Sequence, residues 1–263
     1  MWQYPSIDPV ALDLGFLQIH WYGLMYLIAF ALGWGYAVWR AKSRDDWHAE
    51  MVSDLLFYIA MGVVLGGRIG YILFYDLAYY LANPLTVLEV WHGGMSFHGG
   101  LLGVTLAMWL FARKTKKSLF EVADFVAPLI PIGLLTGRIG NFINGELWGK
   151  VTDSPFGMAV YDPQLQQVVQ KYPTQLLEAF LEGLVLFIIL FFYTQKPRPL
   201  GSVAGLFLAG YGVFRFIVEF YRVPDTQLGY LAWEWLTMGQ VLSVPMIIVG
   251  LLLMYFAKKP KTA

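Results

Sequence analysis

The stretch Gly137-Arg138-Ile139-Gly140-Asn141-Phe142-Ile143-Asn144-Gly145-Glu146-Leu147-Trp148-Gly149 places an arginine, two asparagines and a glutamate at the end of an otherwise apolar run. A charge at the centre of a bilayer costs from about 2.5 to more than 10 kcal/mol, so an arginine at that depth indicates a function. The alternative is an interfacial arginine whose side chain extends to the lipid phosphates. Asn141 lies three residues after Arg138 and on the same helical face. This neighbour favours a polar pocket.

The composition is typical of an integral membrane protein. Of the 263 residues, 58% are hydrophobic and only 14% are charged, whereas soluble domains usually carry about 25% charged residues. The 18 basic and 18 acidic residues balance, so no nucleic-acid partner is expected. The chain has no cysteine, which excludes disulfides, a thiolate nucleophile and cysteine-bound metals. We expect one integral-membrane domain over residues 1–263, without a metal or another cofactor.

Seven apolar runs of roughly spanning length predict seven transmembrane helices. They fall near residues 19–39, 51–75, 97–112, 119–139, 175–194, 201–221 and 238–256. Most basic residues follow the first, third, fifth and seventh runs: Arg40, Lys42 and Arg44; Arg113, Lys114, Lys116 and Lys117; Lys196 and Arg198; Lys258, Lys259 and Lys261. The positive-inside rule then places the N-terminus outside and the C-terminus in the cytoplasm. The predicted fold is an all-α polytopic membrane protein.

The outward-facing segments carry most of the unusual residues. We expect an N-terminal arm over about 1–18, a surface piece over 76–96, and a small cap from the loop at about 141–174. Gly67-Arg68-Ile69-Gly70 resembles Gly137-Arg138-Ile139-Gly140. Four residues do not establish an inverted repeat, and we interpret the glycines as sites of tight helix packing at both places.

The stretch from Trp91 to Gly100 contains two histidines between glycine pairs, with a spacing that fits no common zinc motif. His98 begins an apolar helix, whereas His92 lies before it. Histidine titrates near neutral pH, so His98 is the side chain best suited to accept a proton there. The alternative is a hydrogen-bonded structural histidine.

Arg215, Glu219 and Arg222 recur at helical spacing and predict a shared face. They form either a self-neutralising ion-pair ladder or part of a site. Arg215 together with Arg138 would make a two-arginine anion site, since guanidinium groups match phosphate oxygens. Glu178 and Glu182 stand four residues apart in the fifth run, so one of them is expected to be protonated or paired with an arginine.

At these stretches the sequence resembles the prolipoprotein diacylglyceryl transferase family along nearly the whole chain. The densest matches are His20-Trp21-Tyr22-Gly23-Leu24-Met25-Tyr26, Gly66-Gly67-Arg68-Ile69-Gly70, Gly93-Gly94-Met95-Ser96-Phe97-His98-Gly99-Gly100, residues 137–149 and Arg215 to Arg222. One segment departs from the family, because Tyr172-Pro173-Thr174-Gln175-Leu176-Leu177-Glu178 stands where many members read His-Pro-Ser-Gln-Leu-Tyr-Glu. No role is assigned to position 172 or to the loop 150–171.

The resemblance implies a transferase of the bacterial inner membrane, with seven helices, a periplasmic N-terminus and a site toward the periplasmic leaflet. It would move the diacylglyceryl group of phosphatidylglycerol to the lipobox cysteine of a prolipoprotein signal peptide, the first step of lipoprotein maturation. The products would be a thioether and glycerol 1-phosphate. Matched motifs imply catalytic roles for His98, Arg138 and Arg215. Phosphatidylglycerol-binding roles are expected for Arg138, Tyr22, Asn141, Asn144, Glu146, Gly149, Tyr211 and Glu219.

Two other classes compete with this interpretation. A secondary transporter or lipid-binding protein would use Arg138 and Arg215 as an anion site, although transporter sites usually lie near the midplane and these polar groups lie near one leaflet. A structural scaffold would leave the intramembrane arginines without a purpose. Substrate flux across proteoliposomes separates transport from transfer.

Overall fold

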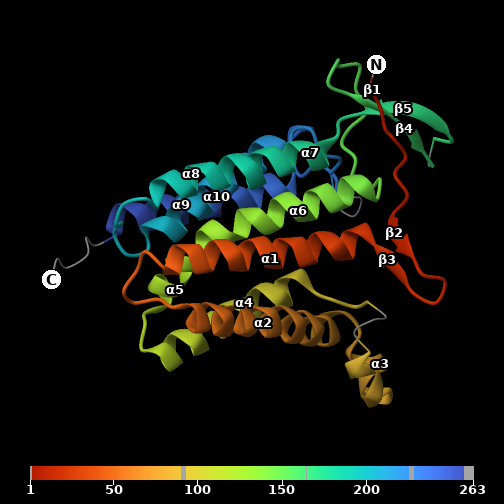
Figure 1. Cartoon of the computed structure of the whole chain (residues 1–263). Helices are drawn as coiled ribbons and strands as arrows, with labels where there is room; N and C mark the ends of the chain where they lie inside the picture. Colours follow the sequence, from red (N-terminus) through yellow and green to blue (C-terminus); the bar gives the residue numbers. More distant parts are fainter. Residues whose placement is uncertain (1, 90–92, 164, 225–227, 258–263) are drawn as a thin grey trace. The chain divides into compact units, whose positions relative to one another are not determined.

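The computed structural model describes residues 2–89, 93–163, 165–224 and 228–257 (Figure 1). His92 and the lysines from Lys258 onward therefore lie outside the described residues. The structure is mostly helical and contains two compact units. The first unit joins the chain up to Gly33 with the chain from Asp124 onward, and the second is Trp34–Ala123.

Every apolar run that predicted a membrane span is helical. Five helices are long and apolar enough to cross a membrane among the residues that the structure describes: Trp21–Ala41, Ala49–Tyr75, Leu119–Ile143, Thr174–Tyr193 and Met238–Phe256. The other two runs form Phe97–Thr115 and the shorter apolar helix Ser202–Val218. A polytopic membrane architecture follows from these lengths, because helices satisfy their backbone hydrogen bonds internally.

Two of the long helices are composite. Leu119–Ile143 consists of α5 (Leu119–Val126), the 3₁₀ turn η3 (Ala127–Leu129) and α6 (Ile130–Ile143). Thr174–Tyr193 consists of α7 (Thr174–Glu178), the π-helical segment η4 (Ala179–Val185) and α8 (Leu186–Tyr193). The remaining helices are α1 (Trp21–Ala41), α2 (Ala49–Tyr75), α3 (Leu77–Ala82), η1 (Pro84–Leu88), α4 (Phe97–Thr115), α9 (Ser202–Val218) and α10 (Met238–Phe256).

In the first unit, α8 and α9 pack around an apolar core. Its buried residues are Ala127, Leu186, Leu190 and Val203. The start of α9 is fixed by Asp124, which accepts hydrogen bonds from the backbone nitrogens of Gly201 (2.6 Å) and Ala204 (2.8 Å). A carboxylate at a helix N-terminus satisfies otherwise unpaired N–H groups and the helix dipole.

Short strands lie outside the helices, so the all-α expectation is wrong for these segments. β1 (Trp2–Gln3), β4 (Met158–Asp162) and β5 (Gln167–Lys171) form a sheet in the order β1-β4-β5, with β1 parallel to β4 and β5 antiparallel to it. β2 (Val10–Asp13) and β3 (Gln18–His20) form a second, antiparallel pair. Figure 1 shows the three-stranded sheet beyond the end of α6. The expected cap therefore contains a β-hairpin to which the N-terminal arm adds a strand, a long-range pairing that local sequence does not reveal.

The glycine-rich face of α2 packs tightly against α4 in the second unit. A Cβ on Gly66 would lie 2.5 Å from the carbonyl oxygen of Gly99, and one on Gly70 would lie 2.6 Å from the Cα of Gly99. Tight packing is thus confirmed at the first glycine motif. It is wrong for Gly137, where a Cβ would have no described neighbour within 4 Å.

Arg68 has a structural role in this unit. Its side chain is buried and donates to the backbone carbonyls of Thr86 (2.6 Å), Val87 (2.9 Å) and Gly93 (2.7 Å), with further bonds to the carbonyls of Gly94 and Glu89. One guanidinium therefore anchors the segment that follows α3. The similarity between Gly67-Arg68-Ile69-Gly70 and the motif around Arg138 does not extend to a similar environment.

Gly103 and Gly100 of α4 offer a matched pair for testing the helix contact. A Cβ on Gly103 would press on the carbonyl oxygen of Gly62 and lie 2.8 Å from the Cα of Gly66, whereas a Cβ on Gly100 would meet only the Val63 carbonyl oxygen at 3.8 Å. We predict that Gly103→Ala lowers the melting temperature in detergent by several degrees. Gly100→Ala should leave it unchanged or raise it, since alanine favours helix by about 1 kcal/mol. Equal behaviour of the two variants would contradict this packing.

Candidate functional site

The polar groups of the first unit converge on one buried carboxylate, Glu178, in the first turns of the fifth predicted span. Its side chain is 1% exposed. The Nε of Arg138 on α6 lies 2.6 Å from Oε2, and the Nη1 of Arg222 donates to Oε1 over 2.6 Å. Arg215 on α9 lies 3.7 Å from Oε2. Glu178 therefore links three arginines from two helices and the segment after α9.

A second carboxylate, Glu219, continues this network at the end of α9. Arg215 forms an ion pair with it one helical turn away, and the Nε of Arg222 lies 3.2 Å from its Oε1. The hydroxyl of Thr237, which caps α10, donates to Oε2 over 2.8 Å. The ion-pair ladder considered for these residues is present, and it also includes Glu178 and Arg138.

The acidic and the basic side chains of this network differ in their exposure to solvent. The carboxylates of Glu178 and Glu219 are 1% and 5% exposed, whereas the three arginine side chains are 18–22% exposed. Three guanidinium groups contact two paired carboxylates, and a third carboxylate, Glu182, is buried four residues after Glu178. The buried carboxylates therefore hold the arginines in place, and the arginine side chains remain partly accessible to an anionic ligand.

The loop after α6 adds amide groups beside Arg138. The Nη1 of Arg138 donates to Oδ1 of Asn141 over 3.4 Å, and the amide of Asn141 donates to Oε1 of Glu146 over 2.8 Å. The amide of Asn144 reaches the same oxygen at 3.4 Å. The backbone turns sharply here, because Gly145 has a φ of +67°. Arg138, both asparagines and Glu146 therefore form one continuous hydrogen-bonded chain.

The fifth span holds this loop in place. Thr174 donates to the carbonyl oxygen of Leu147 over 2.9 Å, and the side-chain amide of Gln175 donates to the carbonyl of Glu146. Both side chains are buried. They belong to the same short helix as Glu178, so α7 positions the arginines and the loop together.

Gly149 lies where this loop meets the segment after α9. Its nitrogen donates to the carbonyl of Tyr172 over 2.9 Å, and the residue pairs with Arg222 in an isolated β-bridge. A Cβ on Gly149 would lie 2.5 Å from the carbonyl oxygen of Tyr221. The structure places Gly149 at a close backbone contact that fixes Arg222.

The two candidate tyrosines lie on different helices of the first unit. Tyr22 on α1 packs over Gly140, where a Cβ would meet its ring carbon at 3.1 Å, and its hydroxyl lies 3.3 Å from that of Tyr26. Tyr211 on α9 packs against the apolar core and stacks on Phe207 with 6.0 Å between ring centroids. Tyr22 thus contacts α6 within one turn of Arg138 and Asn141, because Gly140 lies between these two residues in sequence.

His98 belongs to the second unit and lies in the first turn of α4. Ser96 caps this helix by accepting a hydrogen bond from the nitrogen of Gly99 (3.2 Å). His98 itself is exposed and contacts Phe97 edge to face, with ring centroids 5.6 Å apart. Within the described ranges, no group of three or more histidines and carboxylates is arranged to hold a metal ion.

Two members of the site had no assigned role in the sequence. The sequence predicted that Glu178 or Glu182 is protonated or paired with an arginine, without deciding which. In the structure Glu178 is the one that pairs with arginines. Glu182 is fully buried, and its carboxylate has no hydrogen-bond partner among the described residues. For Arg222 the sequence left two alternatives open, a self-neutralising ladder or part of a site, and no role was assigned to it. One rule could have indicated both residues from the sequence, because arginines in a predicted membrane span need carboxylate partners.

The chain was compared with known proteins. Residues 9–256 match the family model described as prolipoprotein diacylglyceryl transferase. A protein of Hydrogenovibrio crunogenus called phosphatidylglycerol–prolipoprotein diacylglyceryl transferase is 69% identical over 257 residues, which cover 98% of this chain and 97% of that protein. A protein of Pseudomonas paraeruginosa with the same name is 58% identical over 264 residues, which cover 100% of this chain and 98% of that protein.

Glu178→Gln tests the importance of the central carboxylate. We predict a loss of about 3–5 kcal/mol in the free energy of unfolding, because three guanidinium groups lose their buried counterion. The matched control is Glu182→Gln, which changes a carboxylate of equal burial that forms no ion pair with a described residue. Thermal unfolding of both variants in detergent is the measurement. A similar loss in both would show that burial rather than the arginine contacts decides stability.

Proposed function

The chain belongs to the prolipoprotein diacylglyceryl transferase family, and on this premise we propose that it transfers the diacylglyceryl group of phosphatidylglycerol to the lipobox cysteine of prolipoproteins. The products are a thioether and glycerol 1-phosphate, and the reaction is the first step of lipoprotein maturation. The observation that carries the proposal at the level of the site is the accessible arginine group around buried Glu178. The partly exposed guanidinium groups and their fork geometry suit the phosphate of an anionic lipid.

The chemical step is a displacement at carbon. The substrate thiol has an ordinary pKa of about 8.5, and its thiolate is the nucleophile. The sulfur forms a bond to the glyceryl carbon that carries the phosphate, and the carbon–oxygen bond breaks with its electron pair on the departing phosphate. The thiol proton passes to His98 or, where the arginine field lowers the thiol pKa sufficiently, to solvent. No group changes its oxidation state.

Arg138 and Arg215 stabilise the charge that develops on the leaving phosphate. That phosphate gains a negative charge as the bond breaks, so fixed cations stabilise the transition state more than the bound lipid. Glu178 contributes by holding both guanidinium groups in place before the lipid enters. Preorganised charges require no reorientation during the reaction, which is the main source of their effect.

The remaining candidate residues bind or position the lipid. Asn141, Asn144 and Tyr22 hold the headgroup and ester region, while Glu146 orients the two asparagines through its carboxylate. Gly149, Tyr211 and Glu219 shape the site from the segments that carry Arg222 and Arg215. Gly149 and Glu219 contact Arg222 and Arg215, and Tyr211 lies one turn before Arg215 on the same helix.

We propose a seven-span arrangement in the bacterial inner membrane, with the N-terminus and the sheet cap in the periplasm and the C-terminus in the cytoplasm. Support comes from the seven helices at the predicted runs and from the basic residues that follow alternate runs. The site lies at the end of α6 that continues into the cap, which corresponds to the periplasmic leaflet in this topology.

The direct test uses purified protein in detergent, phosphatidylglycerol and a lipobox peptide with a single cysteine. We expect mass spectrometry to show a diacylglyceryl thioether together with glycerol 1-phosphate, and no adduct on a Cys→Ser peptide. The absence of product from folded protein with several anionic lipids would reject the transfer. Lipid or phosphate flux across proteoliposomes would then support the transporter alternative.

His98→Gln separates two roles for the histidine. If His98 accepts the thiol proton, kcat/KM for thioether formation falls about 10²- to 10⁴-fold near pH 7. The deficit narrows as the pH rises above about 8.5, because the thiolate then forms without a base. The melting temperature should not change, since the side chain is exposed.

The matched control for this experiment is His48→Gln, which alters another exposed histidine just before a helix of the same unit. It should leave kcat/KM unchanged at every pH. A deficit in His98→Gln that stays constant between pH 7 and pH 9.5 would show that His98 orients the substrate instead of accepting its proton.

A further inference from the structure

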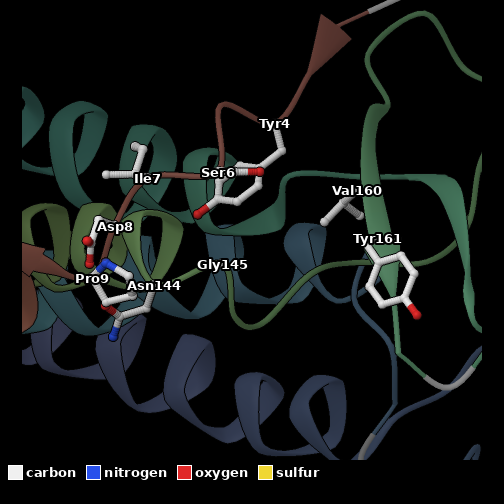
Figure 2. A pocket seen from close by; sticks show the side chains of 9 residues that line it. All are labelled: Tyr4, Ser6, Ile7, Asp8, Pro9, Asn144, Gly145, Val160 and Tyr161. Atoms are coloured by element: carbon white, nitrogen blue, oxygen red, sulfur yellow. The ribbon is translucent and has the colours of Figure 1, made fainter.

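A cavity of about 450 Å³ lies in the first unit between the N-terminal arm and the cap (Figure 2). It is distinct from the arginine group and begins where α6 ends. The lining residues are Tyr4, Ser6, Ile7, Asp8, Pro9, Asn144, Gly145, Val160 and Tyr161. Figure 2 shows Asp8 next to Asn144 on one side and Tyr161 on the opposite side.

The walls of this cavity favour a ligand that donates hydrogen bonds. Asp8 is the one charged residue in the lining, which contains no lysine or arginine. A phosphate group would meet a carboxylate and no cation here. Backbone N–H groups, amides and basic side chains would find acceptors.

Contacts within the protein also hold the residues that line the cavity. The hydroxyl of Tyr4 contacts the carbonyl oxygens of Phe142 (3.0 Å) and Ile143 (2.8 Å), which ties the arm to the end of α6. Strand β1 pairs with β4 of the cap. Ser6 adopts a left-handed conformation with a φ of +46°, a strained geometry for a residue other than glycine. These contacts fix the arm against the cap and against the end of α6.

The cavity lies within a short reach of the reacting groups. Asn144 and Asn141 donate to the same oxygen of Glu146, and Asn141 accepts from Arg138. Arg138 and Asn144 are six residues apart along α6, which corresponds to about 9 Å at 1.5 Å per residue. An extended peptide covers that distance in about three residues.

We propose that this cavity binds the polypeptide substrate just after its acceptor cysteine, through the backbone N–H groups and a donor side chain about three residues beyond the thiol. The inference rests on the proposed transfer to a prolipoprotein. The apolar part of a signal peptide precedes the cysteine and remains in the bilayer, so the residues that follow extend toward the cap. Asp8 then gives the enzyme a preference for a basic residue over an acidic one at that position.

The test compares Asp8→Asn with Asp13→Asn. Both carboxylates accept a backbone hydrogen bond two residues ahead, from Val10 and Gly15 respectively at 2.8 Å, and an asparagine oxygen retains that bond. Asp13 belongs to the same arm but does not line the cavity. Peptides with Lys, Gln or Glu three residues after the cysteine serve as substrates, with phosphatidylglycerol as the lipid.

We expect the KM of the wild type and of Asp13→Asn for the Lys peptide to be about fivefold lower than for the Glu peptide, as for an exposed charge pair. Asp8→Asn should lose this preference while its kcat and its KM for phosphatidylglycerol stay unchanged. The inference is overturned if the wild type has no preference, if Asp8→Asn keeps it, or if Asp8→Asn raises the KM for the lipid instead.

A binding measurement with peptides that cannot react tests the peptide preference independently of the proposed reaction. Fluorescence anisotropy with unreactive Cys→Ser peptides should show the same preference and its loss in Asp8→Asn. Tyr161→Ala, which removes a 60% exposed ring from the cavity wall, should weaken binding of all three peptides several-fold. Failure of thioether formation in the wild type rejects the transfer, whereas equal affinities in wild type and variants reject this cavity as the peptide site.

Discussion

The buried carboxylate of Glu178 is the interaction on which the rest of the site depends. It ties Arg138 of α6, Arg215 of α9 and Arg222 beyond α9 to one point on α7. Three partly buried guanidinium groups would be costly without a counterion. Because the same short helix also holds the loop after α6 through Thr174 and Gln175, the anion-binding groups and their surroundings form as one unit.

The carboxylates and the arginines of this network have different positions relative to solvent. Its carboxylates are buried and its arginines are partly exposed, so the negative charges hold the cations in place without covering them. In the proposed reaction, a lipid phosphate would bind to cations that are already oriented, and the transition state would gain most from such fixed charges. The asparagines that follow Arg138 extend this polar surface toward the cap, where the cavity beside Asp8 has the opposite electrostatic character.

Sequence reasoning located the arginine stretch and the apolar runs that are helical in the structure, since each has a local signal, whereas the role of His98 stays a prediction. It missed the strands of the cap, because β1 pairs with β4 across more than 150 residues and two residues carry no strand signal of their own. It also gave two similar glycine motifs the same explanation. Gly66 and Gly70 do pack against α4, but Gly137 has open space, and Arg68 binds backbone carbonyls where Arg138 binds carboxylates.

The sequence by itself determined the membrane class, the helical runs and the family, because hydrophobic length and short motifs are local properties and a bilayer requires helices to satisfy their own backbone. Only the tertiary structure decided which charge pairs with which. Glu178 and Glu182 have equivalent positions in the sequence pattern, yet one meets three arginines and the other meets no described hydrogen-bond partner. That choice depends on how α6, α7 and α9 pack, and the partners of Glu178 lie about 40 residues away on either side.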